Sequence, residues 1–404
     1  MNIVIAPFAA PFVSLFVNLA KHLEHFSHQV TFAEADPYIS HLLRQEGISS
    51  VSYPKAEAVE NFYTANSNIV KQYCRLHRLK NVQKVVKQKN EAYTRAKAFF
   101  QGAQAQKVII FNGEMNVESD VCKTLGIKTF FCENGYFPEM FQMNRMGVNA
   151  KAEYAQLSSA EFMQMHFPKA NLPQAHLPII DIEQSLIMRY ALRFFSSDYR
   201  RIVWQALQGN KAKNRAMTNF KQAPVDSFNP EQLEMWAFFP LQVNSDTQMV
   251  LNSPYESMYE VLRCTLPKLI RAGYQVVLKE HPDEVEPVDY SEFVDNKQVF
   301  LLKKFDINRL ISESDFTITV NSSVGLQAVS TAKPVILLGE SFYQSAPNVQ
   351  LLAKDSTKLQ LPSTYSATDV ENYIAHFKKE IFIAGNWRKP TSEFLQSLCC
   401  RILA

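Results

Sequence analysis

The strongest constraint on the fold is a repeated pattern in which a short apolar segment ends in polar residues or glycine and a segment of helical periodicity follows. In the first third of the chain, the apolar segments are residues 3–6, 29–35, 107–113 and 128–135. In the last third, they are residues 236–243, 275–282, 299–305, 316–320 and 334–339. Strands that alternate with helices are typical of a parallel sheet with both faces covered. The sequence therefore predicts an α/β fold made of two Rossmann-like halves.

The length of 404 residues also suits two domains better than one. The stretch 220–232 between the two halves is polar and contains two prolines. We therefore predict an N-terminal domain over residues 1–230 and a C-terminal domain over 231–370, with a ligand cleft between them. Residues 371–404 are expected to form helices. The last of these, FLQSLCCRILA, either packs on the N-terminal domain or seeks a membrane, and packing is favoured.

Two helices carry clear end signals in the sequence. The helical segment ESDVCKTLG is expected to end at Gly126, because glycine is a favourable residue just after a helix. A longer helix is expected to begin at Ser253, with Pro254 in its first turn, and to end at Gly273.

Composition argues against several classes of protein. A net charge of +3 and the lack of a known binding motif argue against a nucleic-acid partner. No apolar run reaches the length of a membrane-spanning helix. Pro7 and Pro11 interrupt the apolar N-terminus, which predicts a strand, a turn and a helix rather than a signal peptide. The six cysteines show neither CxxC nor zinc-site spacing, which favours a reducing cytoplasm.

Two segments that break the strand–helix alternation are strongly basic. Residues 70–97 contain nine Lys or Arg and one acid, and residues 188–215 contain seven Lys or Arg and one acid. Both are expected to be helical. Each is either a solvated helix face or a surface that contacts anionic lipid or a charged glycan, since clustered basic residues each add about 1 kcal/mol at an anionic membrane. Peripheral contact with the inner face of the cytoplasmic membrane is therefore one expectation.

The predicted strand 316–320 runs into small polar residues where the next helix begins. Asn321, Ser322, Ser323 and Gly325 lie at this junction. Free N–H groups and the positive end of a helix dipole at such a place bind phosphate or carboxylate. The alternative is a plain helix cap by Ser322 or Ser323. Neither a Walker A loop nor a GxGxxG motif occurs.

Other polar residues follow the remaining strands, and ligands of parallel α/β sheets bind at the carboxyl ends of strands. These candidates are Gln242, Asn244, Ser245, Asp246 and Gln248, then Lys279, Glu280, His281 and Asp283, and in the first half Glu133, Asn134 and Tyr136. Asp246 is either a helix cap or a nucleophile or base. His281 is either structural or a ligand contact.

Six of these segments, in the same order along residues 3–348, resemble the bacterial capsule polysaccharide synthesis family of β-Kdo transferases typified by KpsS and KpsC. They are APFAAPFVSLFVNLAKHL, CENGYFPEMFQMNRMGVNA, PLQVNSDTQM, NSPYESMYEVL, LKEHPDE and TITVNSSVGLQAVSTAKPVILLGESFY. The chain departs from the family pattern at 113–116, 137–139 and 283–285, where arginines of the pattern are missing, so the acceptor stays open.

The resemblance implies a GT-B-like retaining glycosyltransferase that uses CMP-β-Kdo without a metal or another cofactor. Residues 1–230 would be the acceptor side and residues 231–370 would bind the CMP-sugar donor. Asp246 would be the nucleophile, Glu133 the acid/base and His281 a phosphate contact. Donor contacts would come from Gln242, Lys279, Asn321, Ser322, Ser323 and Gly325. Asn134, Tyr136 and Tyr343 would face the acceptor or the cleft.

Two alternatives stay open beside this reading. One keeps the fold and changes the donor to another UDP- or CMP-linked sugar. The other is a protein without catalytic activity that docks a polysaccharide assembly complex. The acceptor is expected to be a lipid or a glycan end.

Overall fold

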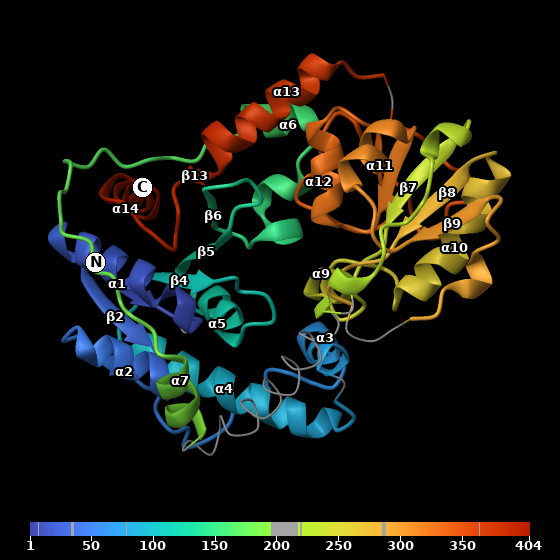
Figure 1. The fold of residues 1–404 in the computed structure, drawn as a ribbon. Helices are drawn as coiled ribbons and strands as arrows, with labels where there is room; N and C mark the ends of the chain where they lie inside the picture. The colour runs from blue at the N-terminus through green and yellow to red at the C-terminus, as the bar shows by residue number, and fades with distance from the viewer. Residues whose placement is uncertain are drawn as a thin grey trace. The chain divides into compact units, whose positions relative to one another are not determined.

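The computed structural model describes residues 1–404 except 7, 34–35, 78, 195–216, 219, 285–287 and 363. The chain forms two compact units (Figure 1). Unit 1 comprises Met1–Glu153, Gln164–Gln205 and His376–Ala404, and unit 2 comprises Tyr154–Met163 and Ala206–Ala375. Each is described below by itself.

Unit 1 is built on a seven-stranded sheet whose central strands are parallel. In spatial order its strands are β13 (Ile383–Ala384), β6 (Met140–Asn144), β5 (Lys128–Asn134), β4 (Lys107–Phe111), β1 (Asn2–Ile5), β2 (Gln29–Ala33) and β3 (Ser50–Val51). The strands β6 and β13 at one edge run antiparallel to their neighbours. Ile3, Ile5 and Ile109 point into one buried cluster, and Val4, Val108 and Ile110 into another, so both faces of the sheet are covered.

The helices of unit 1 include the predicted helix that ends at Gly126. They are η1 (Ala10–Phe12), α1 (Val13–His25), α2 (Pro37–Gln45), α3 (Asn68–Leu76), α4 (Val82–Gly102), α5 (Val117–Leu125), η2 (Asn149–Lys151), α7 (Leu186–Phe194), the π-helical turn η6 (Phe377–Ile381) and α14 (Ser392–Leu403). Gly126 follows α5 with φ 67°, a left-handed conformation that glycine adopts without strain. The expected C-cap is confirmed.

The C-terminal segment of the chain is part of unit 1. Leu395, Leu398 and Ile402 of α14 are fully buried in the cluster that also holds residues of α1. Lys107 Nζ donates to the Ile402 carbonyl, and Arg401 Nη1 donates to the Met143 carbonyl at 3.2 Å. The last helix therefore packs its apolar face against unit 1. Among the described residues, no helix is long and apolar enough to cross a membrane.

Unit 2 is built on a six-stranded sheet whose neighbouring strands are all parallel among the described residues. In spatial order its strands are β12 (Val349–Leu351), β11 (Val335–Leu337), β10 (Phe316–Thr319), β7 (Trp236–Pro240), β8 (Gln275–Lys279) and β9 (Val299–Leu302). The strands β7 and β10 are buried along their whole length, which requires cover on both faces. The prediction of two Rossmann-like α/β units is confirmed, whereas the cleft and the boundaries at 230 and 371 stay predictions.

The helices of unit 2 correct one expectation. They are η3 (Glu153–Gln156), α6 (Ser159–Gln164), η4 (Pro230–Gln232), α9 (Thr247–Leu251), α10 (Met258–Arg271), η5 (Ser291–Phe293), α11 (Ile307–Glu313), α12 (Ser323–Ser330) and α13 (Ala367–His376). The long helix begins at Met258, not at Ser253. Ser257 caps it by accepting from Glu260 N at 3.2 Å, while Ser253 accepts from Tyr255 N at 3.0 Å. Tyr255 is 1% exposed, so burial of its ring keeps 253–257 out of the helix.

Candidate functional site

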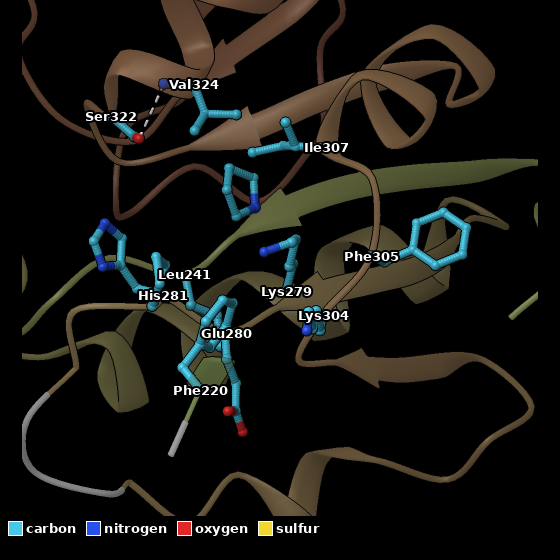
Figure 2. Close-up of a pocket in the computed structure, with 12 residues that line it drawn as sticks. Phe220, Leu241, Lys279, Glu280, His281, Lys304, Phe305, Ile307, Ser322 and Val324 are labelled. Carbon is cyan, nitrogen blue, oxygen red and sulfur yellow. Dashed lines mark hydrogen bonds between the residues drawn. The ribbon is translucent and has the colours of Figure 1, made fainter. Parts of the chain in front are cut away.

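A cavity of about 370 Å³ opens at the carboxyl edge of the unit 2 sheet (Figure 2). The ends of β7 and β8, the loop before α11 and the first turn of α12 meet there. Its lining residues are Phe220, Pro240, Leu241, Lys279, Glu280, His281, Pro282, Lys304, Phe305, Ile307, Ser322 and Val324. This is the edge at which parallel α/β sheets bind ligands, and the volume suits a small molecule.

Lys279 is the last residue of β8 and brings a buried cation to the cavity. Its side chain is 8% exposed, and its ammonium lies 5.6 Å from the centre of the Phe220 ring. Within the described part of the chain, this ammonium donates no hydrogen bond. Burial lowers the pKa of Lys279, and the nearby carboxylates of Asp226 and Glu280 oppose this shift. The carboxylate of Glu280 points away from the ammonium in Figure 2, so the cavity presents a positive charge.

His281 follows two residues after the end of β8, and the structure defines its tautomer. Asp283 N donates to His281 Nδ1 at 3.1 Å, so this nitrogen carries no proton. The neutral ring therefore keeps its proton on Nε2, which makes Nε2–H a hydrogen-bond donor. Figure 2 shows Ser322, His281 and Lys279 around the same space. The structure thus brings these three predicted residues together.

The two serines at the start of α12 differ in their surroundings. Ser322 is the N-cap, and its Oγ accepts from Val324 N at 3.1 Å. Ser322 also lines the cavity, together with Val324. Ser323, by contrast, is exposed and is not among the lining residues. The cap alternative therefore holds for Ser322, and the α12 N-terminus still directs the positive end of its dipole toward the cavity edge.

Gln242 and Asn321 use their polar groups within the protein. Gln242 Nε2 donates to Asn321 Oδ1 at 3.0 Å, and Gln242 Oε1 accepts from Asn321 N at 3.0 Å. Asn321 Nδ2 donates to the carbonyls of Gln248, Asn252 and Glu340. Both side chains are less than 10% exposed. They join the ends of β7 and β10, which positions the cavity wall rather than lining it.

Gly325 and Tyr343 also act on the α12 N-terminus from within. The fully buried Tyr343 donates its hydroxyl to the Ser322 carbonyl at 2.6 Å. A Cβ atom at Gly325 would lie 2.1 Å from this hydroxyl, so only glycine leaves room for it. Burial raises the pKa of Tyr343. Neither residue lines the cavity, and both hold the first turn of α12 in place.

Asp246 lies outside the lining of this cavity. It is exposed and caps α9, with Oδ1 accepting from Gln248 N at 2.8 Å. No residue of the described part of the chain forms a hydrogen bond or ion pair with its second oxygen, Oδ2. The helix cap therefore engages one carboxylate oxygen of Asp246, and the role of Asp246 as a nucleophile stays a prediction.

Glu133 lies in unit 1, near the carboxyl end of β5. Its carboxylate accepts from Asn112 Nδ2 at 2.6 Å and from Asn134 N at 2.9 Å. Burial raises the pKa of Glu133, and these two hydrogen bonds oppose the shift. A raised pKa makes a carboxylate a stronger base than an ordinary glutamate, which suits a group that takes up a proton during catalysis.

The other two predicted residues of unit 1 lie on the turn between β5 and β6. Tyr136 donates its hydroxyl to Asn149 Oδ1 at 2.6 Å, and Gln142 Nε2 donates to the Asn134 carbonyl at 2.8 Å. Asn134 is exposed, whereas Asn149 is buried. Both Asn134 and Tyr136 line a second cavity, which belongs entirely to unit 1.

The basic segments are only partly visible. In 70–97, Lys71 and Arg75 of α3, Lys84 and Lys87 of α4 and Lys80 between the two helices are exposed, and Arg78 lies outside the described residues. Of the segment 188–215, only 188–194 lies within the described residues, where Arg193 pairs with Asp36. The predicted helix over the rest of that segment is therefore outside what the structure describes.

Sequence reasoning missed the wall formed by Phe220 and Lys304. The carboxylate of Asp226 accepts from the backbone N–H groups of Lys303 and Lys304 at 2.7 Å. Lys304 Nζ donates to the carbonyl of Lys221 at 3.1 Å. These contacts hold residues 220–226 beside the end of β9. Nothing in this polar stretch signals the placement, because it depends on partners some 80 positions away, at separations of 77, 78 and 83.

The fold and the site define an α/β protein with a cavity at the carboxyl edge of a parallel sheet, lined by two lysines, a histidine and one carboxylate. A sequence profile described as "Capsule polysaccharide biosynthesis protein" matches residues 106–347, more than half of the chain. The chain belongs to this family.

Individual relatives are more distant. Protein FixF of Sinorhizobium fredii (strain NBRC 101917 / NGR234) is 26% identical over 244 residues, which are 58% of this chain and 49% of FixF. The chain thus spans about half the length of this curated relative.

Several solved structures are similar to this chain, with low sequence identities and low TM-scores. Two solved structures of KpsC from Thermosulfurimonas dismutans, described as a beta Kdo 2,7 transferase and a beta Kdo 2,4 transferase, are 11% and 12% identical. They align over 92% and 91% of this chain and 89% of each structure, with TM-scores of 0.41 and 0.38. A UDP-GlcNAc 2-epimerase from Methanocaldococcus jannaschii is 10% identical over 100% of this chain and 99% of its own, with a TM-score of 0.31. At these scores the likeness carries no argument about function.

Proposed function

We propose that this chain is a retaining glycosyltransferase that transfers β-Kdo from CMP-β-Kdo to a lipid or glycan acceptor in capsule or surface polysaccharide biosynthesis. Membership of the capsule polysaccharide biosynthesis family and the motif resemblance support the proposal. The observation that carries it is the convergence of Lys279, His281 and the α12 N-terminus on one cavity at the carboxyl edge of the unit 2 sheet.

The cavity has the charge that a departing CMP requires. The Lys279 ammonium supplies a positive charge, His281 Nε2–H supplies a donor, and the α12 dipole adds a partial positive charge. Preorganised groups of this kind stabilise the phosphate as it leaves with the bonding electrons. Because they supply this countercharge, we expect transfer to need no metal, so activity should survive treatment with EDTA.

Retention requires two displacements at the anomeric carbon. In the first, Asp246 forms a bond to that carbon while the bond to the CMP phosphate breaks. In the second, an acceptor hydroxyl attacks, the bond to Asp246 breaks, and Glu133 takes the hydroxyl proton. Asp246 Oδ2 suits the first role because Oδ1 is held by the helix cap, and the raised pKa of Glu133 suits the second.

Intact-protein mass spectrometry with CMP-Kdo generated in situ tests both the donor and the nucleophile. Asp246→Asn removes the nucleophile but keeps the cap, since Asn caps helices as well as Asp. Asp306→Asn is the matched control, because Asp306 caps α11 through the same contact, from Asn308 N at 2.9 Å. The wild type and Asp306→Asn should gain the mass of one Kdo, and Asp246→Asn should not.

Other outcomes separate the alternatives. No adduct and no CMP release above the Asp246→Asn background would argue against Kdo transfer, and a panel of UDP- and CMP-linked sugars would then identify the donor. CMP release without an adduct would keep the donor and remove the covalent step. Failure with every nucleotide sugar and acceptor would favour the docking protein.

We also propose that the α3–α4 surface places the enzyme on the cytoplasmic face of an anionic membrane. Lys71, Lys80 and Lys84 are exposed, and none forms an ion pair with a described residue. Each such charge adds about 1 kcal/mol at an anionic surface. Sedimentation with phosphatidylglycerol vesicles should capture the chain, whereas phosphatidylcholine vesicles, or a Lys71→Glu, Lys80→Glu, Lys84→Glu variant, should not.

A further inference from the structure

Unit 1 contains a second cavity of about 350 Å³. The sequence motifs predicted Asn134 and Tyr136 of its lining but not the other lining residues. The cavity lies between the β5–β6 turn, residues 134–140, and the segment 385–388 that follows β13. Asn134, at one wall, donates its backbone N–H to the carboxylate of Glu133 at 2.9 Å. The cavity therefore adjoins the group to which we assign the acceptor proton.

The walls of this cavity are fixed by backbone contacts. Gly135 N donates to the Met140 carbonyl at 2.8 Å, and Gly385 N donates to the Glu139 carbonyl at 2.7 Å. A Cβ atom at Gly135 would lie 2.4 Å from the Met140 oxygen, so the tight turn requires glycine. Strand pairing of Ile383 with Phe141 continues the same connection. The cavity is thus preformed rather than dependent on a ligand.

Two cations are held on aromatic rings that line this cavity, and one of them, Arg388, lines the cavity itself. The Arg388 guanidinium lies 4.3 Å from the centre of the Trp387 ring, which is itself stacked on Phe12 at 4.0 Å. Lys378 Nζ, from the π-helical turn η6, lies 4.9 Å from the centre of the Phe137 ring. Both cations are exposed, and neither forms an ion pair within the described residues. Ring stacking orients each charge while leaving its N–H groups for a ligand.

We infer that this cavity is an acceptor subsite that binds a sugar residue bearing a carboxylate, held by Arg388 and supported by Lys378. The inference rests on the proposed function and names the acceptor class. Arginine in a fixed orientation binds a carboxylate through two parallel hydrogen bonds. A volume of about 350 Å³ accommodates a single sugar ring, and the aromatic walls suit its apolar face. Glu139 also lines the cavity and opposes the anion, whereas Lys378, which lies over the ring of the lining residue Phe137, adds a second positive charge beside it.

NMR titration of the full chain with methyl β-D-glucuronide and with methyl β-D-glucoside tests the subsite. No nucleotide-sugar donor is needed for this measurement. The glucuronide should bind about tenfold more tightly than the glucoside, because only it makes the charged pair. Arg388→Gln should remove this preference, and Arg388→Lys should restore part of it. Lys389→Gln is the matched control, since Lys389 is the next residue, is exposed and does not line the cavity. Glu139→Gln should strengthen glucuronide binding two- to threefold.

Three results would overturn the inference. They are equal affinity for both glycosides, an equal loss in Lys389→Gln and Arg388→Gln, and tighter binding of glycerol 1-phosphate than of the glucuronide, which would point to a lipid headgroup instead. Titration with CMP, whose cavity lies in unit 2, is measured on the same samples. If the wild-type chain prefers the glucuronide but does not bind CMP, this result counts against the proposed donor and leaves the acceptor subsite in place.

Discussion

The carboxyl edges of the two sheets differ in how they use their polar side chains. In unit 2, Gln242 and Asn321 bind each other and the backbone, which leaves Lys279 and His281 to face the cavity. In unit 1, the polar group at the corresponding edge is Glu133, a carboxylate with a raised pKa. The edge of unit 2 therefore presents positive charge, which the proposal assigns to the donor phosphate, and the edge of unit 1 presents the carboxylate to which the proposal assigns the acceptor proton. A two-substrate transfer needs both.

The largest expected effect comes from removing the proton acceptor. Glu133→Gln should lower the rate of transfer to an acceptor about 10²- to 10⁴-fold, the usual contribution of general acid–base catalysis. CMP binding in unit 2 should be unchanged, and measuring both on one sample separates catalysis from folding. Transfer at the wild-type rate would remove Glu133 from the mechanism.

The pH dependence of transfer sharpens the same assignment. Glu133 acts as a base only when deprotonated, and burial raises its pKa from the ordinary 4.5. The acidic limb of the rate should therefore lie above the range of an ordinary glutamate. Asn112→Ala removes a hydrogen bond that favours the carboxylate, so the limb should move to still higher pH. A limb that stays in place would assign it to another group.

The next largest effect is on stability and comes from the contacts that hold the α12 N-terminus at the edge of the unit 2 sheet. Gly325→Ala places a methyl group 2.1 Å from the Tyr343 hydroxyl, which must move and lose its bond to the Ser322 carbonyl. The free energy of unfolding should fall by about 2–4 kcal/mol. Tyr343→Phe loses only the hydrogen bond and should cost about 1 kcal/mol. The double variant should recover part of the loss in urea titrations, because the clashing oxygen is gone; an additive loss would contradict this account.

A smaller effect is expected when the positive charge of Lys279 is removed from the unit 2 cavity. Lys279→Gln should weaken CMP binding about 10- to 100-fold, as expected for a lost charged contact. Burial lowers the pKa of Lys279 below the ordinary 10.5, and binding needs the protonated form. Wild-type affinity should therefore fall with rising pH before an ordinary lysine would titrate. Lys303→Gln, an exposed neighbour that does not line the cavity, should bind CMP normally. Equal losses in both variants would place the phosphate elsewhere.

Much of the fold follows from local sequence. Short apolar runs separated by helical patterns predict both parallel sheets, and Gly126 predicts the end of α5 because both signals depend on near neighbours. The start of α10 is not local in this sense. Ser253 and Ser257 are both good caps, and burial of the Tyr255 ring in the core decides between them.

The candidate site is predictable in place but not in detail. Strand ends locate Lys279, His281 and Ser322 correctly at one cavity. Whether a polar side chain there faces a ligand or a neighbour depends on strand pairing, and β7 beside β10 turns Gln242 toward Asn321. Arg388 reaches the β5–β6 turn only because β13 pairs with β6, some 240 residues earlier in the chain, with Ile383 opposite Phe141. Periodicity contains no such information.

The smallest effect comes from comparing the two neighbouring serines. Ser322→Ala removes the cap of α12 and should cost about 1 kcal/mol of folding free energy, with a few-fold loss of CMP affinity because the first turn of the helix loosens. Ser323→Ala should change neither quantity beyond about 0.5 kcal/mol, since the side chain is exposed and faces no cavity wall. Urea titration and CMP binding measure both. If Ser323→Ala weakened CMP binding more than Ser322→Ala, the phosphate would lie on the outer side of the α12 N-terminus. The phosphate site of unit 2 would then be centred on Ser323 rather than on Lys279.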